Sequence, residues 1–511
     1  MPEIALDPPL KPGPTIPASA FPGKRKLIGS TLSLWASRIF GALISGVQAI
    51  YIGRVLGPEK FGLFNLIYLI GWYVGMVHPG ARDVAFRDIP YFRGRKDPVR
   101  EKLSRDVSVT SEILWRALAS SGLALAALLL KDRLLRYGLL LWAVSMFLMR
   151  MAELYNAIGT VEEDFVFVSW VNCTRLALAF GFVLASIRWL GIYAPVLAPA
   201  AGSAAAVVIY ARRHPLAFSF LLDRGQLQRM VAVGVPLASL TFAYWLYQSA
   251  DRSLVAAVMS KSDLGCYAIA AFIVQFVTQL PADFITVIQP NLYRELGKEN
   301  RLADVKGLIV HTTRAYAYLS PLAILLLWTW FPVLVHLLLP KYEASIPVLR
   351  ILSLTIFFSS LLVMPHTILY SPGINRQIIC VGVWCGSALL TAGTGYGLVR
   401  LGCGLSGVAA ASVLGQALAA AAFLTLTRRY YCEWMHQTWC FYLEMLGPVS
   451  YAGVVLILLK YYRLQATSIS ALLMESALLL VVYAPCLLFF NRQTGLLKWK
   501  LRQRLVNGLG L

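Results

Sequence analysis

The sequence contains little charge, and acidic side chains are the rarer of its charged groups. Charged residues make up 14% of the 511 positions, with 25 Asp and Glu against 46 Lys and Arg. Hydrophobic residues make up 58%, and the mean hydropathy is +0.66. Because the core of a soluble domain cannot bury so large an apolar fraction, this balance excludes a soluble protein and predicts an integral membrane protein.

Several motifs that would indicate enzyme or metal chemistry are also missing. The chain has no Gly-x-x-x-x-Gly-Lys-Ser/Thr sequence, which excludes a P-loop for ATP. Its eight cysteines contain no Cys-x-x-Cys pair, and its six histidines show no metal-ligand spacing. We therefore expect no cofactor, no metal centre and no disulfide framework.

Long apolar stretches fill most of the chain. Stretches of about 18 to 25 residues are long enough to cross a bilayer as a helix, and we predict fourteen of them. The expected fold is an all-α membrane protein, with two pseudo-symmetric six-helix bundles followed by two C-terminal transmembrane helices. The predicted units are a disordered cytoplasmic tail at 1–26, an N-terminal bundle at 27–212, a C-terminal bundle at 213–430, the two additional helices at 431–490 and a basic cytoplasmic tail at 491–511.

The distribution of positive charge sets the expected orientation. With the N-terminus inside, the cytoplasmic segments hold about 28 Lys and Arg and the opposite segments about 12, as the positive-inside rule requires. Both termini are therefore predicted to be cytoplasmic, and the net charge of +21 is explained without a nucleic-acid partner. The charged segment 82–105 is expected to be a cytoplasmic loop that meets anionic membrane lipids, or alternatively a docking surface for glycosyltransferases.

Isolated arginines lie inside or at the mouths of the apolar stretches. A charged side chain at the bilayer centre costs about 2.5 to 3.5 kcal/mol on insertion scales, so such residues usually face a watery cavity. A guanidinium binds phosphate oxygens in pairs and stays charged at any relevant pH. The candidates for binding an anionic cargo are Arg38, Arg54, Arg116, Arg150, Arg175 and Arg252. Arg54 can instead snorkel to the interface, and Arg150 can pair with Glu153 on one helical face.

Carboxylates in the apolar stretches are the candidates for ion coupling, because a buried carboxylate can take up H⁺ or hold Na⁺. These candidates are Asp251, Glu153 and Asp283. Asp251 adjoins Arg252, so a self-neutralising pair or an interfacial cap is the alternative for it. Glu112 and Glu444 begin their stretches and are predicted to be interfacial.

The two predicted bundles also share a sequence pattern. Val55, Gly62 and Phe64 recur as Val258, Gly265 and Tyr267, all at one offset of 203 residues. Both sets lie at the junction of the first two stretches of their bundle. The pattern predicts an internal duplication with a binding site between the halves.

Several segments of the chain carry a family resemblance. They are RVLGPEKFGLF (54–64), ADRSLVAAV (250–258) followed by SKSDLGCYAIA (260–270), Pro290 at the end of the eighth stretch, and KYEASIPVLRILSL (341–354). In order and spacing they resemble the polysaccharide flippases of the multidrug/oligosaccharidyl-lipid/polysaccharide (MOP) exporter superfamily, in particular the Wzx type of O-antigen and exopolysaccharide synthesis. The pattern Ser-Arg-Ile-Phe-Gly at 37–41 is similar to one in the more distant lipid II flippase.

The resemblance implies a transporter and not an enzyme. It implies movement of undecaprenyl-diphosphate-linked oligosaccharides from the cytoplasmic to the periplasmic leaflet of a bacterial inner membrane by alternating access. Glycosyltransferases and a polymerase of the same pathway are the implied partners, besides membrane lipids. Separately from the resemblance, the membrane potential can drive export of a diphosphate by itself, and resetting of the carrier by H⁺ or Na⁺ is the alternative left open. Under this interpretation Tyr244, Trp245 and Tyr247 either stack on sugar rings or only pack.

Two other classes of protein stay open. A polytopic glycosyltransferase or polymerase is the enzyme alternative, although the predicted outer loops are short for a catalytic site. A drug or cation antiporter of the MATE type shares the superfamily and the duplication, although a cationic cargo calls for more carboxylates in the apolar stretches than this chain has.

Overall fold

The structure, a computed structural model, describes residues 24–494 except 79, 81–88, 90, 91, 94, 95, 163, 214–219, 222, 297–301, 371–375, 432–434 and 462–468. Every regular element in that part of the chain is a helix, and eleven helices in it are long and apolar enough to cross a membrane. One of the eleven, within α1 (Lys24–Met76), is two crossings joined at a kink. Counting it twice and adding α3 and α8, long helices outside the eleven, gives the predicted fourteen. The all-helical membrane fold is confirmed.

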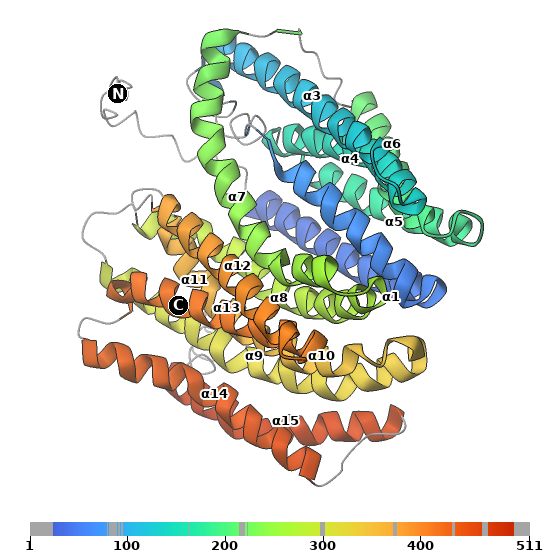
Figure 1. Cartoon of the computed structure of the whole chain (residues 1–511). Helices are drawn as coiled ribbons and strands as arrows, with labels where there is room; N and C mark the ends of the chain where they lie inside the picture. Colours follow the sequence, from blue (N-terminus) through green and yellow to red (C-terminus); the bar gives the residue numbers. More distant parts are fainter. Residues whose placement is uncertain are drawn as a thin grey trace.

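A glycine–proline pair divides α1 into its two crossings. Gly57 has a φ of 74° and a ψ of 170°, a conformation in which a side chain would be strained. Pro58 follows in the first turn of the second segment, where its missing N–H removes no helical hydrogen bond. The pair therefore ends one crossing and starts the next without a loop (Figure 1).

The first half of the molecule contains α1 and four further helices, drawn in the upper part of Figure 1. They are α3 (Pro98–Leu128), α4 (Arg133–Val161), α5 (Phe165–Leu190) and α6 (Tyr193–Arg213). α4 and α5 pack on α6, α3 packs on α4, and α1 packs on α5. One sequence expectation is corrected here: α3 begins at Pro98, capped by the Asp97 carboxylate, so the end of the predicted loop 82–105 is helix.

The second half contains α7 to α13. Their bounds are α7 (Arg224–Val258), α8 (Lys261–Leu296), α9 (Leu302–Leu338), α10 (Ser345–Leu352), α11 (Leu354–Leu369), α12 (Gln377–Arg400) and α13 (Gly404–Leu426), with short 3-10 turns η2 (Pro340–Tyr342) and η3 (Arg428–Tyr430). α10 and α11 together form one crossing. The last two helices, α14 (Met435–Tyr461) and α15 (Ile469–Thr494), pack on α9 at the outside of the second half (Figure 1).

The halves are joined where α1 crosses α8, and the joint is symmetric. A Cβ on Gly62 would lie 1.7 Å from the carbonyl oxygen of Lys261, and a Cβ on Gly265 would lie 2.0 Å from that of Pro58. Positions 58 and 261, like 62 and 265, are separated by the repeat offset of 203. Each half therefore presents the same glycine to the same backbone position of the other, as a local two-fold axis requires.

Two further contacts close the same end of the molecule. The hydroxyl of Tyr342 donates a buried hydrogen bond of 2.8 Å to the carbonyl oxygen of Gly53. On the surface, the ammonium of Lys261 lies 2.8 Å from the carboxylate of Asp132, the N-cap of α4. The hydrogen bond from Lys261 is the largest of the causes that lower the pKa of Asp132. Both contacts tie the first half to the second.

Candidate substrate-binding site between the two halves

The middle of α3 carries a buried ion pair. Glu112 and Arg116 lie four residues apart on one helical face, their N–O distance is 2.7 Å, and their side chains are only 2% and 1% exposed. A second nitrogen of Arg116 donates a 2.6 Å hydrogen bond to the carbonyl oxygen of Gly75 in the last turn of α1, where helical carbonyls lack partners. Arg116 thus holds α3 against the end of α1.

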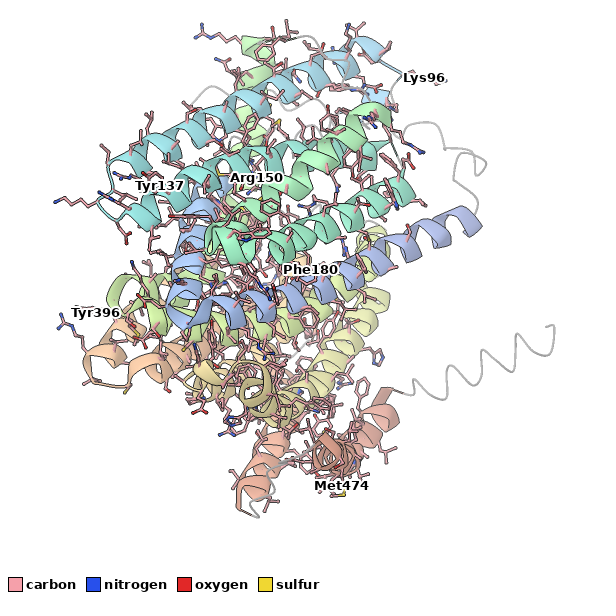
Figure 2. The ribbon with its side chains drawn as sticks, turned by 90° about the vertical axis from the view of Figure 1, so that its right-hand side faces the viewer. Lys96, Tyr137, Arg150, Phe180, Tyr396 and Met474 are labelled. Atoms are coloured by element: carbon pink, nitrogen blue, oxygen red, sulfur yellow. The ribbon has the colours of Figure 1, made fainter. Side chains whose placement is uncertain are left out.

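Arg150 of α4 lies on the other side of Gly75. Its guanidinium stacks over the indole of Trp72 at 4.9 Å from the ring centroid and pairs with Glu153 at 2.6 Å. A Cβ on Gly75 would lie 3.0 Å from Nη2 of Arg150, so the glycine gives this nitrogen its space. Nη2 is buried and finds no hydrogen-bond partner in the described part of the chain. Figure 2 shows Arg150 among the helices of the first half.

Arg175 completes an arginine cluster, by which we mean Arg116, Arg150 and Arg175 with Glu112 and Glu153. Arg175 lies on α5 within electrostatic range of Glu153 and of Tyr210. The absence of a side chain at Gly202 lets α6 approach the Arg175 backbone, because a Cβ there would lie 2.3 Å from its carbonyl oxygen. The cluster holds one more positive than negative charge, so it is less basic than the arginines alone predicted.

Aromatic side chains of α1 connect the arginine cluster to α7. Tyr68 lies within electrostatic range of both Arg150 and Arg252. Trp72, which carries Arg150 on its face, meets Trp245 edge to face with ring centroids 5.6 Å apart. These ring contacts join the first half to the second.

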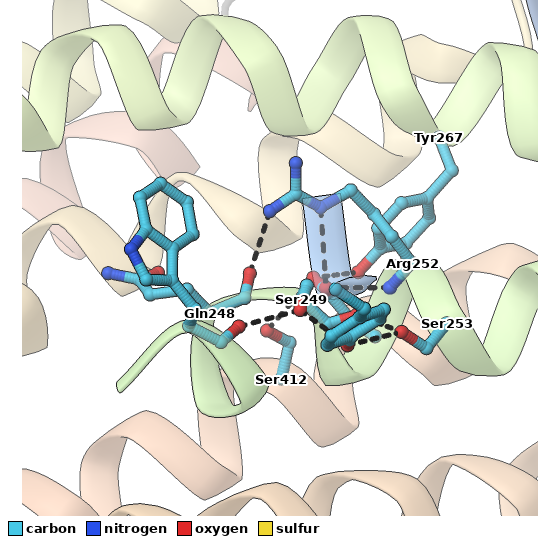
Figure 3. A network of polar contacts seen from close by, with 9 residues as sticks. Gln248, Ser249, Arg252, Ser253, Tyr267 and Ser412 are labelled. Atoms are coloured by element: carbon cyan, nitrogen blue, oxygen red, sulfur yellow. Dashed lines mark hydrogen bonds and ion pairs between the residues drawn. The ribbon is translucent and has the colours of Figure 1, made fainter. Parts of the chain in front are cut away.

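Asp251 is the centre of a polar network on α7, and Figure 3 shows its partners Arg252, Tyr267 and Ser412. Its carboxylate accepts hydrogen bonds from Tyr267 at 2.8 Å, from Ser412 at 3.3 Å and from the backbone N–H of Arg252 at 2.7 Å. The Arg252 guanidinium lies 3.9 Å from the carboxylate, too far for a hydrogen bond to it. It donates instead to the carbonyl oxygen of Gln248 at 2.8 Å. Asp251 is 7% exposed, so it is not an interfacial cap, and Tyr267 is a closer partner than Arg252.

The sequence-predicted residues therefore divide into three sets. Arg116, Arg150, Arg175 and Glu153 meet in the first half, and Asp251 and Arg252 meet in the second. Arg38 and Arg54 are exposed on the first segment of α1, outside both groups. Asp283 belongs to α8, and its side chain lies outside the described residues. No group of three or more His, Cys, Asp and Glu side chains in the described residues is placed to hold a metal ion.

Sequence reasoning missed or misplaced three participants. Glu112 and Glu444 were predicted to be interfacial, yet each pairs with an arginine, Glu112 with Arg116 and Glu444 with Arg314 at 2.9 Å. The i, i+4 spacing of Glu112 and Arg116 was a signal that could have found the first pair. Trp72 had no such signal, because its role depends on a helix packed from another part of the chain.

Comparisons with known proteins agree with this architecture. Residues 107–347 match the sequence profile of a family described as "Polysaccharide biosynthesis protein". The match covers a little under half of the chain, from α3 into α10, and so includes the arginine cluster and Asp251. No curated protein matches the chain in sequence.

Solved transporter structures share the fold. The lipid II flippase MurJ in an inward closed conformation gives a TM-score of 0.67 at 12% identity, over 91% of this chain and 99% of that chain. A multidrug resistance MATE family transporter of the MOP superfamily gives 0.66 at 14% identity in its inward-facing conformation, over 78% of this chain and 98% of that chain. Its outward-facing conformation gives 0.59 at 15% identity, over 78% and 95%.

Proposed function

We propose that this protein is a polysaccharide flippase of the MOP exporter superfamily, as the sequence predicted, and its family profile and its fold both support this proposal. We propose that its cargo is an undecaprenyl-diphosphate-linked oligosaccharide, carried from the cytoplasmic to the periplasmic leaflet. The observation that carries this proposal is Nη2 of Arg150, a buried, unsatisfied guanidinium nitrogen in a cluster with one excess positive charge.

The diphosphate supplies the chemistry that this cluster lacks. An unsatisfied buried donor costs free energy, and a phosphate oxygen is among the strongest acceptors for a guanidinium. Arg150 has one nitrogen on Glu153 and another without a partner, so it can bind a phosphate oxygen without giving up its ion pair. Arg175 lies within electrostatic range of Glu153, so its charge adds to the attraction. We assign the diphosphate to Arg150 and Arg175, with Arg116 as their support.

Transport in this proposal follows the membrane potential. Moving one negative charge out of an interior-negative cell is favourable by about 2.3 kcal/mol per 100 mV, so a diphosphate with two charges gains about 4.6. Resetting of the empty carrier by H⁺ or Na⁺ is assigned to Glu153 in the first half and Asp251 in the second. Asp251 accepts from Tyr267 and Ser412, and loss of its charge would loosen contacts that join α7 to α8 and α13.

The proposed setting is a bacterial inner membrane with both termini in the cytoplasm. In that orientation the contacts of Gly62, Tyr342 and Lys261 lie at the periplasmic end, so they would have to open for release. The proposed partners are membrane lipids and the glycosyltransferases and polymerase that build and extend the cargo. No nucleic acid is involved in this proposal.

Deletion of the gene in its host tests the proposal, with lipid-linked oligosaccharides and surface polysaccharide measured together. Loss of surface polymer with complete repeat units accumulating on lipid diphosphate is the expected result. Restoration by the wild-type gene but not by R150Q would tie the defect to the arginine cluster, and R314Q, which alters a pair on α9, serves as the matched control. Truncated lipid-linked intermediates would indicate a transferase, and intact polymer with sensitivity to cationic drugs would indicate an antiporter.

A further inference from the structure

The second half contains a space lined by aromatic rings that the arginine cluster does not use. This aromatic chamber, with a cavity volume of about 320 Å³, lies between α7, α8, α11 and α12. Its aromatic lining residues are Tyr244, Tyr247, His366, Tyr370 and Trp384. Trp384 lies 4.6 Å from Tyr247 and 5.4 Å from Tyr244 between ring centroids, and His366 stacks with Tyr370 at 5.9 Å.

Three polar atoms of this lining are buried without a hydrogen-bond partner in the described residues. They are the hydroxyl of Tyr247, Nε2 of His366 and Nε1 of Trp384. Tyr247 is 6% exposed and Trp384 1%. Orphaned polar groups are rare in native interiors, because each costs the free energy of its lost hydration. Three of them at one cavity therefore indicate a ligand that supplies donors and acceptors.

A second space adjoins the first and shares Gln248 and Ser359 with it. This amide chamber, with a cavity volume of about 30 Å³, is lined by Gln275 and Gln416 together with threonine and serine hydroxyls, and Asp251 and Arg252 lie at its wall. Gln248 also donates to the hydroxyl of Tyr244 at 2.8 Å, so the polar and the aromatic linings are connected.

We propose that the aromatic chamber binds an uncharged sugar ring of the saccharide part of the cargo, with the polar groups of the adjoining amide chamber at its side; this inference rests on the proposed function. A pyranose has apolar C–H faces, which pack on aromatic rings, and a rim of hydroxyls that both donate and accept. Among the described residues, no Asp, Glu, Lys or Arg lines the aromatic chamber, which argues against a cation or an anion there. A purely apolar ligand would leave the three orphaned atoms unsatisfied.

The position of the chambers fits a ligand that also reaches the arginine cluster. Tyr244 lies 6.3 Å from Trp245, and Trp245 lies 5.6 Å from Trp72, on whose face Arg150 stacks. A continuous line of aromatic rings therefore leads from the proposed diphosphate position to the proposed sugar position. The diphosphate is bound by the first half and the sugars by the second.

Two probes test the site on the full chain in nanodiscs. The first probe is the host's own repeat-unit oligosaccharide, released from its lipid by mild acid and followed by saturation-transfer NMR. The second is inorganic pyrophosphate, followed by ³¹P line broadening. The key variant is Y247F, which removes one orphaned hydroxyl and keeps the ring. Its matched control is Y210F, because the Tyr210 hydroxyl is also buried without a partner but lies in the first half.

We expect Y247F to weaken oligosaccharide binding at least fivefold, with thermal stability and pyrophosphate binding unchanged, and Y210F to leave oligosaccharide binding unchanged. Equal oligosaccharide binding by wild type and Y247F would overturn the sugar site, as would binding of pyrophosphate without any of the sugar. That last result leaves the flippase proposal standing. Sugar binding without pyrophosphate binding would instead contradict the diphosphate assignment and support the chambers. H366N provides a second variant at the same cavity, with the same expected loss.

Discussion

The two halves share a repeated fold, yet they bury different side chains. Among the described residues the first half buries four charged side chains, Asp106, Glu112, Arg116 and Arg150, and the second half buries one, Asp251. The second half instead has aromatic and amide linings around its two chambers. Under the proposed function, this difference would divide one amphiphilic cargo between the halves, with its charged part on the first and its neutral part on the second.

The largest loss of stability is expected at the most deeply buried ion pair of the first half, Glu112 with Arg116. Replacing Arg116 by Met leaves Glu112 buried without its partner, and breaking a buried pair in this way costs about 3 to 5 kcal/mol. R314M breaks the pair of Arg314 with Glu444. These two side chains are 23% and 22% exposed, so the loss of stability should be smaller. Thermal unfolding in detergent measures both variants. Equal losses would mean that burial of charge does not distinguish the halves.

The glycine crossing is where the halves should behave alike. A methyl group on Gly62 or on Gly265 meets backbone atoms that cannot rotate away, and overpacking of this kind costs about 1 to 3 kcal/mol. G62A and G265A should therefore lower the unfolding temperature by similar amounts. Gly46, also in α1, has no atom within 4 Å of its added Cβ and is the control. G46A should be neutral or slightly stabilising, and a strong effect of only one crossing variant would contradict the two-fold symmetry.

A third test separates anion binding from ion coupling. R150Q removes the unsatisfied nitrogen and should weaken pyrophosphate binding about tenfold, or about 1.4 kcal/mol. D251N keeps the shape of the Asp251 side chain and should leave pyrophosphate binding intact while abolishing the response of liposome transport to H⁺ or Na⁺ gradients. Transport that ignores voltage and both gradients in the wild type would remove the coupling proposal. Loss of pyrophosphate binding in D251N would break the division between the halves.

The smallest effect is expected at the surface pair of Asp132 and Lys261, which are 39% and 42% exposed. Exposed pairs contribute about 0.2 to 1 kcal/mol at most, so D132N should barely change stability. Because folding lowers the pKa of Asp132, the contribution is present above the unfolded pKa of about 3.9 and is lost as pH falls through the lower folded value. Unfolding of wild type and D132N should therefore differ by a constant amount between pH 5 and 8. A difference that changed within this range would contradict the assignment.

The sequence predicted the crossings well because the length and the apolar composition of a membrane helix are both visible in its sequence. α3 was predicted as an apolar stretch at 108–130, although the buried polar side chains of Ser104, Asp106 and Glu112 lower its hydropathy below that of the eleven most apolar helices. The sequence predicted that arginines form the site, but it identified only some of the arginines that lie there. Arg116 and Arg150 lie in it, whereas Arg38 and Arg54 are exposed. The local spacings i, i+4 and i, i+3 indicate Glu112 and Glu153 as the partners of Arg116 and Arg150. The orphaned atoms around His366 depend instead on packing between distant helices, which no local pattern encodes.

The symmetric crossing of Gly62 and Gly265 also has a consequence for the history of the chain. If the halves were separate polypeptides of one sequence, each would offer the other the same glycine and accept the same carbonyl, as protomers of a homodimer do. The joint is therefore a dimer interface enclosed within a single polypeptide. A gene cut between α6 and α7 would yield two fragments that still carry matching surfaces, and their co-expression should reassemble a transporter from two genes.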